Sequence, residues 1–194
     1  MAKLKRQDLL PLERYAEQRA AIRRTVMAHK KRRRVPIGDH LALYFEDAIT
    51  MRYQVQEMLR IERIFEPEGI EDELAAYNPL IPDGSNWKAT VMIEYIDIEE
   101  RRRRLRELNG IENTIYIQVG HFDPVYAIVN EDLERATDDK TSSVHFARFE
   151  FSPEMISSMK QGARIRAGVR HDAYPAEAAE ITGKVRDSLV ADFD

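Results

Sequence analysis

The stretch AHKKRRRVPIGDHLALYFED, residues 28–47, marks the change from a long predicted helix to the first predicted strand. Upstream of it, five side chains at spacings of three and four define one narrow stripe, and four of them are apolar: Leu12, Tyr15, Arg19, Ile22 and Val26. This spacing indicates an amphipathic helix that buries a single stripe. Pro36 and Gly38 are expected to end that helix. Beyond them the segment HLALYFED (40–47), with Leu41, Leu43 and Phe45 on one face, predicts a short strand.

Five consecutive basic residues lie at the predicted end of this helix: Lys30, Lys31, Arg32, Arg33 and Arg34. At the other end, Asp8 is a candidate N-cap and Pro11 suits the first helical turn. Positive charge close to a helix C-terminus is stabilised by the helix dipole. The same run has the charge density that attracts phosphate groups, although no aromatic side chains are interleaved with it.

The net charge is divided unevenly along the chain. Residues 1–34 carry twelve Lys and Arg against three Asp and Glu, a net charge of +9, whereas residues 35–194 carry a net charge of −13. Opposite charges of this size favour attraction between the N-terminal helix and the rest, within one chain or across a dimer. We therefore interpret the basic run first as a clamp onto an acidic surface, and second as a site for nucleic acid or another anion.

The composition limits the class of protein. The 194 residues are 43% hydrophobic and 33% charged, which is typical of a globular domain in water. The chain has no cysteine, which excludes disulfides, a cysteine nucleophile and cysteine-bound zinc or iron–sulfur clusters. The N-terminal residues lack the apolar core of a secretion signal, and no apolar run reaches the length of a membrane span. We expect a cytoplasmic protein without membrane contact.

The pattern after residue 47 predicts helices first and strands later. Helices are expected at 49–65, 69–77, 97–108 (capped by Asp97), 152–160 (capped by Ser152) and 175–193. Strands are expected at 87–96, 113–120, 124–130, 143–151 and 163–171, with a polar loop at 131–142. The short connection between the second and third of these strands predicts antiparallel neighbours.

These elements predict an α+β fold, mainly an antiparallel sheet with helices packed on it. An N-terminal amphipathic helix precedes the sheet. The N-terminal basic arm would cover residues 1–38 and the α+β domain residues 39–194, with a helical half to about residue 82.

Two stretches, KKRRRVPIGDHLALYFEDAITMRYQVQEMLRIERI (30–64) and ELAAYNPLIPDGSNWKATVMIEY (73–95), resemble one bacterial family of about 200 residues. It is the domain-of-unknown-function family thirty-five-oh-one. The segment Phe45–Glu62 is the most specific part, and GVRHDAYP (168–175) resembles the family's closing pattern. The resemblance implies no reaction and no catalytic residue. It implies an accessory role in oxidative stress or redox metabolism, because members are encoded near rubrerythrin-like and iron–sulfur oxidoreductase proteins.

Three histidines on predicted strands are the candidate metal ligands: His121, His145 and His171. If their strands are neighbours, the imidazoles would converge on one sheet face, as a catalytic zinc or non-haem iron site requires. Glu94 is a candidate fourth ligand or base. The alternative, which we favour, is that each histidine bonds a neighbouring carboxylate or backbone group. Glu-x-x-His does not occur in the chain, which excludes a rubrerythrin-like di-iron site on these helices.

Three functions remain open, and we rank them. The first is a non-enzymatic accessory or interaction protein without a cofactor, forming a homodimer through the N-terminal helix and contacting a redox protein. The second is a metal-dependent enzyme that uses the histidines. The third is binding of nucleic acid, or another anion, through the basic run.

Overall fold

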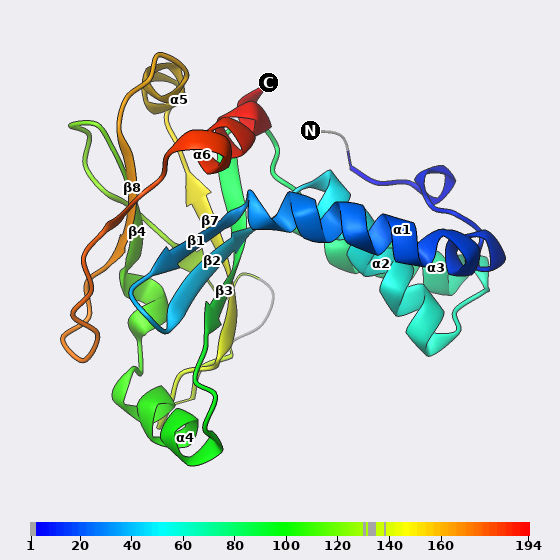
Figure 1. The fold of residues 1–194 in the computed structure, drawn as a ribbon, viewed down its shortest axis with the longest axis horizontal. Coiled ribbons are helices and arrows are strands. Elements are labelled where there is room, and N and C mark those ends of the chain that lie inside the picture. The colour runs from blue at the N-terminus through cyan, green and yellow to red at the C-terminus, as the bar shows by residue number, and fades with distance from the viewer. Residues whose placement is uncertain (1–2, 130, 132–134, 138) are drawn as a thin grey trace.

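The computed structural model describes residues 3–129, 131, 135–137 and 139–194. It places a body of two β-sheets beside a projecting arm of helices (Figure 1). The arm consists of α1 (Leu12–Lys31), α2 (Ala48–Glu62) and α3 (Pro67–Tyr77). The fold class is α+β, as predicted. No helix within the described residues is long and apolar enough to cross a membrane.

Two antiparallel sheets, rather than the single predicted sheet, form the body. The first has the strand order β1-β2-β3-β7-β6 and the second the order β5-β4-β8-β9. Their bounds are Arg34–Ile37 (β1), Leu41–Phe45 (β2), Asn86–Ile93 (β3), Ile115–Val119 (β4), Val125–Tyr126 (β5), Ile128–Val129 (β6), Val144–Glu150 (β7), Ile165–Val169 (β8) and Ala179–Glu180 (β9). The predicted antiparallel pairing of β4 with β5 is confirmed. β7 in the first sheet and β4 in the second both alternate buried and partly exposed residues, so this alternation does not show which sheet a strand belongs to.

One contiguous apolar core fills the body and contains residues of both sheets. Trp87 on β3 is fully buried, and its indole N–H donates to the carbonyl oxygen of Leu189 at 2.9 Å. The Trp87 ring packs edge-on against Phe151 and is stacked on Phe193. Leu189 belongs to α6 (Gly183–Val190) and Phe193 to the 3₁₀ turn η4 (Ala191–Phe193), so the C-terminal helix closes one end of the core.

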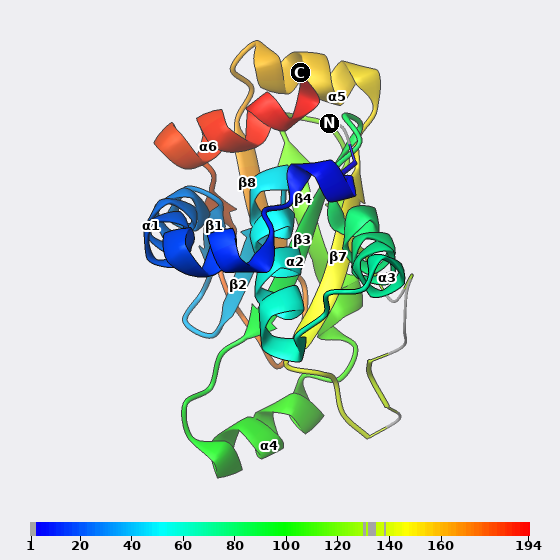
Figure 2. The ribbon, with the colours of Figure 1, turned by 90° about the vertical axis from the view of Figure 1, so that its right-hand side faces the viewer.

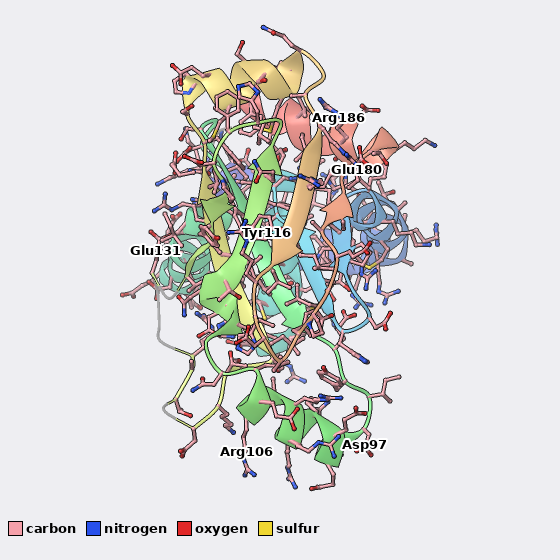
Figure 3. All side chains as sticks on the ribbon, turned by 90° about the vertical axis from the view of Figure 1, so that its left-hand side faces the viewer. Asp97, Arg106, Tyr116, Glu131, Glu180 and Arg186 are labelled. Atoms are coloured by element: carbon pink, nitrogen blue, oxygen red, sulfur yellow. The ribbon has the colours of Figure 1, made fainter. Side chains whose placement is uncertain are left out.

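The outer face of the second sheet, shown in Figure 3, carries a tyrosine packed flat on its neighbouring strand. Tyr116 on β4 lies across Gly168 on β8, and a Cβ atom at Gly168 would collide with the Tyr116 hydroxyl. The Arg170 guanidinium lies 5.1 Å from the centre of the Tyr116 ring and donates to the Tyr126 hydroxyl. Glycine at position 168 is therefore required for this close approach.

The apolar stripe of α1 packs against α2 of the same chain (Figures 1 and 2). Tyr15 and Val26 from the stripe are buried. Between α2 and α3, a small separate cluster of Val55, Leu59 and Leu74 forms the core of the arm. The stripe is thus buried within the chain at Tyr15 and Val26 and partly buried at Leu12, Arg19 and Ile22.

The end of α1 differs from the prediction. The helix ends at Lys31, before Pro36 and Gly38, and the backbone from Arg34 onward pairs with β2 as the edge strand β1. Pro36 lies within β1 and is exposed. An edge strand tolerates proline because one side of it has no hydrogen-bonded neighbour.

Two other helix boundaries are corrected. Asp8 does not cap α1, because it ends a 3₁₀ turn, η1 (Arg6–Asp8), and accepts the N–H of Lys5, while Pro11 stands at the N-cap of α1. The predicted helix at 175–193 begins only at Gly183. Before it, the alanine-rich segment forms β9, because pairing of Ala179 with Ala167 on β8 outweighs the local helix propensity.

The single strand predicted at 124–130 is divided into β5 in the second sheet and β6 in the first, whereas most other elements lie close to their predicted places. Helices α4 (Ile98–Glu107) and α5 (Pro153–Lys160) begin after Asp97 and Ser152, and both predicted caps are confirmed by side chains that accept backbone N–H groups. The other 3₁₀ turns are η2 (Asn78–Leu80) and η3 (Ile111–Thr114). The predicted loop at 131–142 and the end of the predicted strand at 124–130 fall partly outside the described residues.

An ion pair on the arm fastens α1 to α2. The Arg19 guanidinium donates to both oxygens of Glu57, at 2.8 and 2.7 Å, and the Tyr15 hydroxyl donates to Glu57 Oε1 at 2.7 Å. The hydrogen bond from Arg19, and then that from Tyr15, lower the pKa of Glu57 to about 2, although burial opposes them. Ionised Glu57 therefore stabilises the packing of the two helices.

We expect acid to weaken the arm through Glu57. Because the folded-state pKa lies below the ordinary value of 4.5, the stabilisation is complete above pH 4.5 and is lost as the pH falls toward 2. The loss should be about 1–2 kcal/mol, since Arg19 is partly exposed and solvent screens the pair. Urea unfolding at pH 6 and pH 3 would measure it. In Glu57→Gln this part of the pH dependence should vanish, and an unchanged pH slope would contradict the assignment.

Candidate functional site

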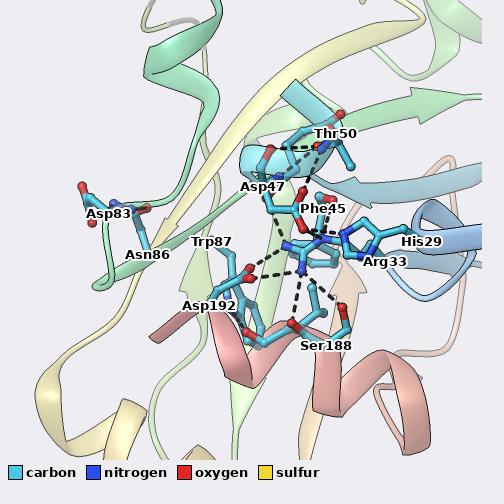
Figure 4. Close-up of polar contacts among 12 residues, drawn as sticks. His29, Arg33, Phe45, Asp47, Thr50, Asp83, Asn86, Trp87, Ser188 and Asp192 are labelled. Atoms are coloured by element: carbon cyan, nitrogen blue, oxygen red, sulfur yellow. Dashed lines mark hydrogen bonds and ion pairs between the residues drawn. The ribbon is translucent and has the colours of Figure 1, made fainter. Parts of the chain in front are cut away.

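The buried guanidinium of Arg33 lies where the arm meets the body (Figure 4). Its two Nη atoms donate to the two carboxylate oxygens of Asp192, at 3.0 and 2.5 Å. Its Nε donates to the carbonyl oxygen of Phe45 and Nη2 to that of Glu46, each at 3.0 Å. Nη1 also donates to the carbonyl oxygen of Ser188 at 3.1 Å. One side chain therefore joins the end of α1, the β2–α2 connection and the C-terminal helix.

A second buried carboxylate, that of Asp47, adjoins it. His29 Nε2 lies 2.5 Å from Asp47 Oδ2, and the other Asp47 oxygen accepts the N–H of Thr50 as the N-cap of α2. Burial raises the pKa of Asp47, but Arg33, the Thr50 N–H and His29 outweigh it, and the pKa is lowered. For Asp192, burial raises the pKa above its ordinary value in spite of Arg33. Both carboxylates depend on the same guanidinium.

The five residues of the predicted basic run have different surroundings in the structure. Arg33 forms the clamp onto acidic residues that the charge division indicates. Arg34 is also held internally, since it donates to the Tyr44 hydroxyl at 2.8 Å and to Glu94 at 3.2 Å. The side chains of Lys30, Lys31 and Arg32 make no hydrogen bond or ion pair with any described residue, and Lys31 and Arg32 are exposed. Anion binding by the run stays a prediction, and these three residues are the ones available for it.

The predicted metal ligands are not brought together. His145 lies on β7 in the first sheet, whereas His121 and His171 follow β4 and β8 in the second sheet. His121 stacks on Phe122, and His171 lies 3.1 Å from the carbonyl oxygen of Asn109. Glu94 is engaged with Arg34 and Tyr44. Among the described residues no three His, Asp or Glu side chains form a group that could hold a metal ion. The expectation that the three histidine-bearing strands are neighbours in one sheet is therefore wrong.

His145 instead belongs to a buried polar group. Thr141 Oγ1 donates to Glu112 Oε2 at 2.7 Å and lies 2.8 Å from His145 Nε2. Because the single Thr141 hydrogen goes to Glu112, His145 Nε2 carries a hydrogen and donates to Thr141 Oγ1. Burial lowers the pKa of His145, against the opposing charge of Glu112. The group is packed beneath the surface and lines none of the pockets described below.

A pocket that the sequence does not reveal lies against the first sheet. We call it the Glu46 pocket; its volume is about 290 Å³ and its lining residues are Glu46, Pro79, Leu80, Lys88, Ala89, Glu131, Phe146, Ala147 and Arg148. Glu46 follows β2 directly and is buried. The one sequence signal for it is a charged residue placed immediately after a strand. Residues of β3 and η2 line the pocket beside Glu46, and the sequence does not indicate that these two segments lie next to Glu46.

The tip of the arm is hollowed by a larger groove. We call it the arm-tip groove; its volume is about 760 Å³ and its apolar lining is Leu9, Leu10, Pro11, Leu12, Leu59, Ile64, Phe65 and Ile70. Its charged lining is Lys5, Arg6, Glu13 and Glu71. Phe65 is 60% exposed, and Ile61 nearby on α2 is 60% exposed as well. Apolar side chains this accessible, beside an apolar hollow, are typical of an interaction surface.

Comparison with known proteins agrees with the resemblance seen in the sequence. A family model described as "Protein of unknown function (DUF3501)" matches residues 3–193. The chain belongs to this family. A crystal structure of a novel protein of unknown function from Burkholderia pseudomallei K96243 is 51% identical, with both chains covered in full and a TM-score of 0.94. No curated protein matches the chain. The family and its solved structure thus share this fold without assigning it an activity.

Replacing Arg33 should loosen the DUF3501 fold more than any other change in the basic run. In Arg33→Met, two buried carboxylates lose their partner, and the free energy of unfolding should fall by about 3–5 kcal/mol. Urea unfolding followed by tryptophan fluorescence suits this test, because Trp87 is bonded to the C-terminal helix that Arg33 holds.

The matched control is the exposed neighbour Arg32. Arg32→Met should change the free energy of unfolding by less than about 0.5 kcal/mol. Equal effects of the two substitutions would show that the clamp does not hold the fold together.

Proposed function

We propose that this chain is a non-catalytic accessory protein of the bacterial cytosol that works as a homodimer joined at the arm-tip groove. The observation that carries the proposal is the groove itself, with exposed Phe65 and Ile61 beside it. The groove lies on the projecting arm, away from the sheets (Figure 1). A second copy can therefore approach it without meeting the body.

The groove has the features of a self-complementary surface. In a two-fold dimer each protomer offers the same patch, so a protruding apolar group must lie beside a matching hollow. Phe65 provides the protrusion and the leucine-rich lining provides the hollow. The charged lining contains two basic residues, Lys5 and Arg6, and two acidic residues, Glu13 and Glu71. Rims of mixed charge can pair when two copies face each other.

The contact differs from the one that the sequence suggests. Most of α1 packs against α2, so the dimer would use only the beginning of α1, near Leu12 and Glu13. The remainder of the contact would come from the end of α2 and from α3, because residues of both segments line the same groove.

An indirect part in redox metabolism belongs to the same proposal. The chain has no cysteine, so a redox role would be indirect, with the thiol chemistry in a partner protein, or would use a metal held by histidines and carboxylates. The dimer would present two arms to that partner. This part rests on the family resemblance and not on the site geometry.

Light scattering tests the dimer directly. At about 50 µM, the wild-type chain should have the mass of two protomers, because a stable interface of more than about 1,000 Å² forms. Phe65→Glu should give the mass of one protomer, since it would bury a charge without a partner in an apolar contact.

The control is Ile96→Glu, because Ile96 is fully exposed in the segment before α4 and lies outside the groove. This variant should remain a dimer. A wild-type chain that is monomeric at this concentration, or a dimer that Phe65→Glu leaves intact, would overturn the proposal.

A further inference from the structure

The backbone of Glu46 is fixed on both sides, which sets the direction of its side chain. Its N–H donates to the carbonyl oxygen of Lys88 at 2.8 Å and thereby extends the β2–β3 pairing by one residue. Its own carbonyl oxygen accepts Arg33 Nη2 at 3.0 Å. Alternation along the strand then places the Glu46 carboxylate on the same sheet face as Thr90, and the Thr90 hydroxyl donates to Glu46 Oε1 at 2.7 Å.

The other carboxylate oxygen has no donor. Glu46 Oε2 is buried, and within the described part of the chain no group lies within hydrogen-bonding distance of it. The whole residue is only 5% exposed. A buried carboxylate oxygen without a hydrogen bond is strongly unfavourable. Less than 1 Å² of Oε2 is accessible, so a donor in the adjoining pocket would bond this atom once the Glu46 carboxylate turns toward the pocket that the residue lines.

The surroundings of Glu46 make the pocket selective. Most of its wall is hydrocarbon, from Leu80, Phe146 and their neighbours. The two cationic side chains in the lining are held by other acceptors: Lys88 Nζ donates to the carbonyl oxygen of Pro79 at 2.5 Å, and the Arg148 guanidinium donates to Glu131 and Glu150. Neither of them bonds the Glu46 carboxylate.

We propose that the Glu46 pocket binds a small alkylammonium ligand, that is, a primary ammonium group on a short hydrocarbon chain. One ammonium N–H donates to Glu46 Oε2, and the hydrocarbon chain lies against Leu80 and Phe146. The volume of about 290 Å³ corresponds to roughly ten water molecules and fits a short chain. The proposal is independent of the dimer, because the pocket and the arm-tip groove share no residue.

The free oxygen also discriminates between kinds of cation. A guanidinium group prefers two carboxylate oxygens at once, and Oε1 is already occupied by Thr90. A calcium or magnesium ion requires about six oxygen ligands, and the described residues contain no cluster of acidic side chains that would supply them. An ammonium group has three separate N–H donors and needs neither a bidentate partner nor a cluster of oxygens, so one of them can use the single free oxygen of Glu46.

Calorimetric titration of the full chain in phosphate buffer at pH 7 tests the proposal, with n-butylammonium chloride as the probe. Wild-type protein should bind it saturably, with a dissociation constant below about 10 mM. Glu46→Gln should weaken binding at least tenfold, because the neutral amide loses the charge-assisted hydrogen bond. Sodium butyrate and 1-butanol, which have the same chain without the ammonium group, should not bind.

The matched control is Glu94→Gln, which removes a carboxylate already paired with Arg34 and Tyr44. Its affinity for n-butylammonium should equal that of the wild type. Failure of the wild type to bind, equal affinity of Glu46→Gln, or equal weakening by Glu94→Gln would each overturn the proposal. Where Glu46→Gln fails to fold, Leu80→Trp replaces it: Leu80 is only partly buried, so the larger side chain is accommodated and fills the pocket. Binding should then be lost, and retained binding would overturn the proposal as well.

Discussion

The orientation of the arm depends on the hydrogen bonds of a single guanidinium, that of Arg33. It reaches Asp192 across 159 positions of sequence and also holds the carbonyl groups that begin the β2–α2 connection. Such a group is strongly anchored because Arg33 and both of its carboxylate partners, Asp47 and Asp192, are buried, and an unpaired buried charge is costly. The end of α1, the N-terminus of α2 and the C-terminal helix are consequently fixed relative to one another, and the backbone of Glu46 in the Glu46 pocket is held by the same guanidinium.

The sequence was sufficient for much of the fold, because the periods of its apolar residues are local properties. The stripe of α1, the antiparallel pair β4–β5 and the caps at Asp97 and Ser152 are all read from neighbouring residues. It was not sufficient where pairing between distant segments decides the outcome. The alanine-rich segment before Gly183 favours a helix on its own, yet it forms a strand beside β8.

The same limit applies to the candidate sites. The charge division indicates a clamp, but the choice of Arg33 over its four basic neighbours depends on which side chain the turn after α1 directs inward. The three histidines share an alternating pattern, but that pattern does not say which strands belong to one sheet. The Glu46 pocket requires the β2–β3 register, which brings Thr90 opposite Tyr44. No local feature of the sequence contains that register.

The proline in β1 has a further consequence for assembly. An exposed sheet edge normally offers a row of N–H and C=O groups to which a strand of another molecule can add, and this is a common route to aggregation. Pro36 has no N–H to offer, and it stands in the middle of the outermost strand of the first sheet. Continuation of the sheet into a neighbouring molecule is therefore blocked at this edge. A copy that approached this edge would have to bind through side chains, and such a contact can stop at a defined number of subunits.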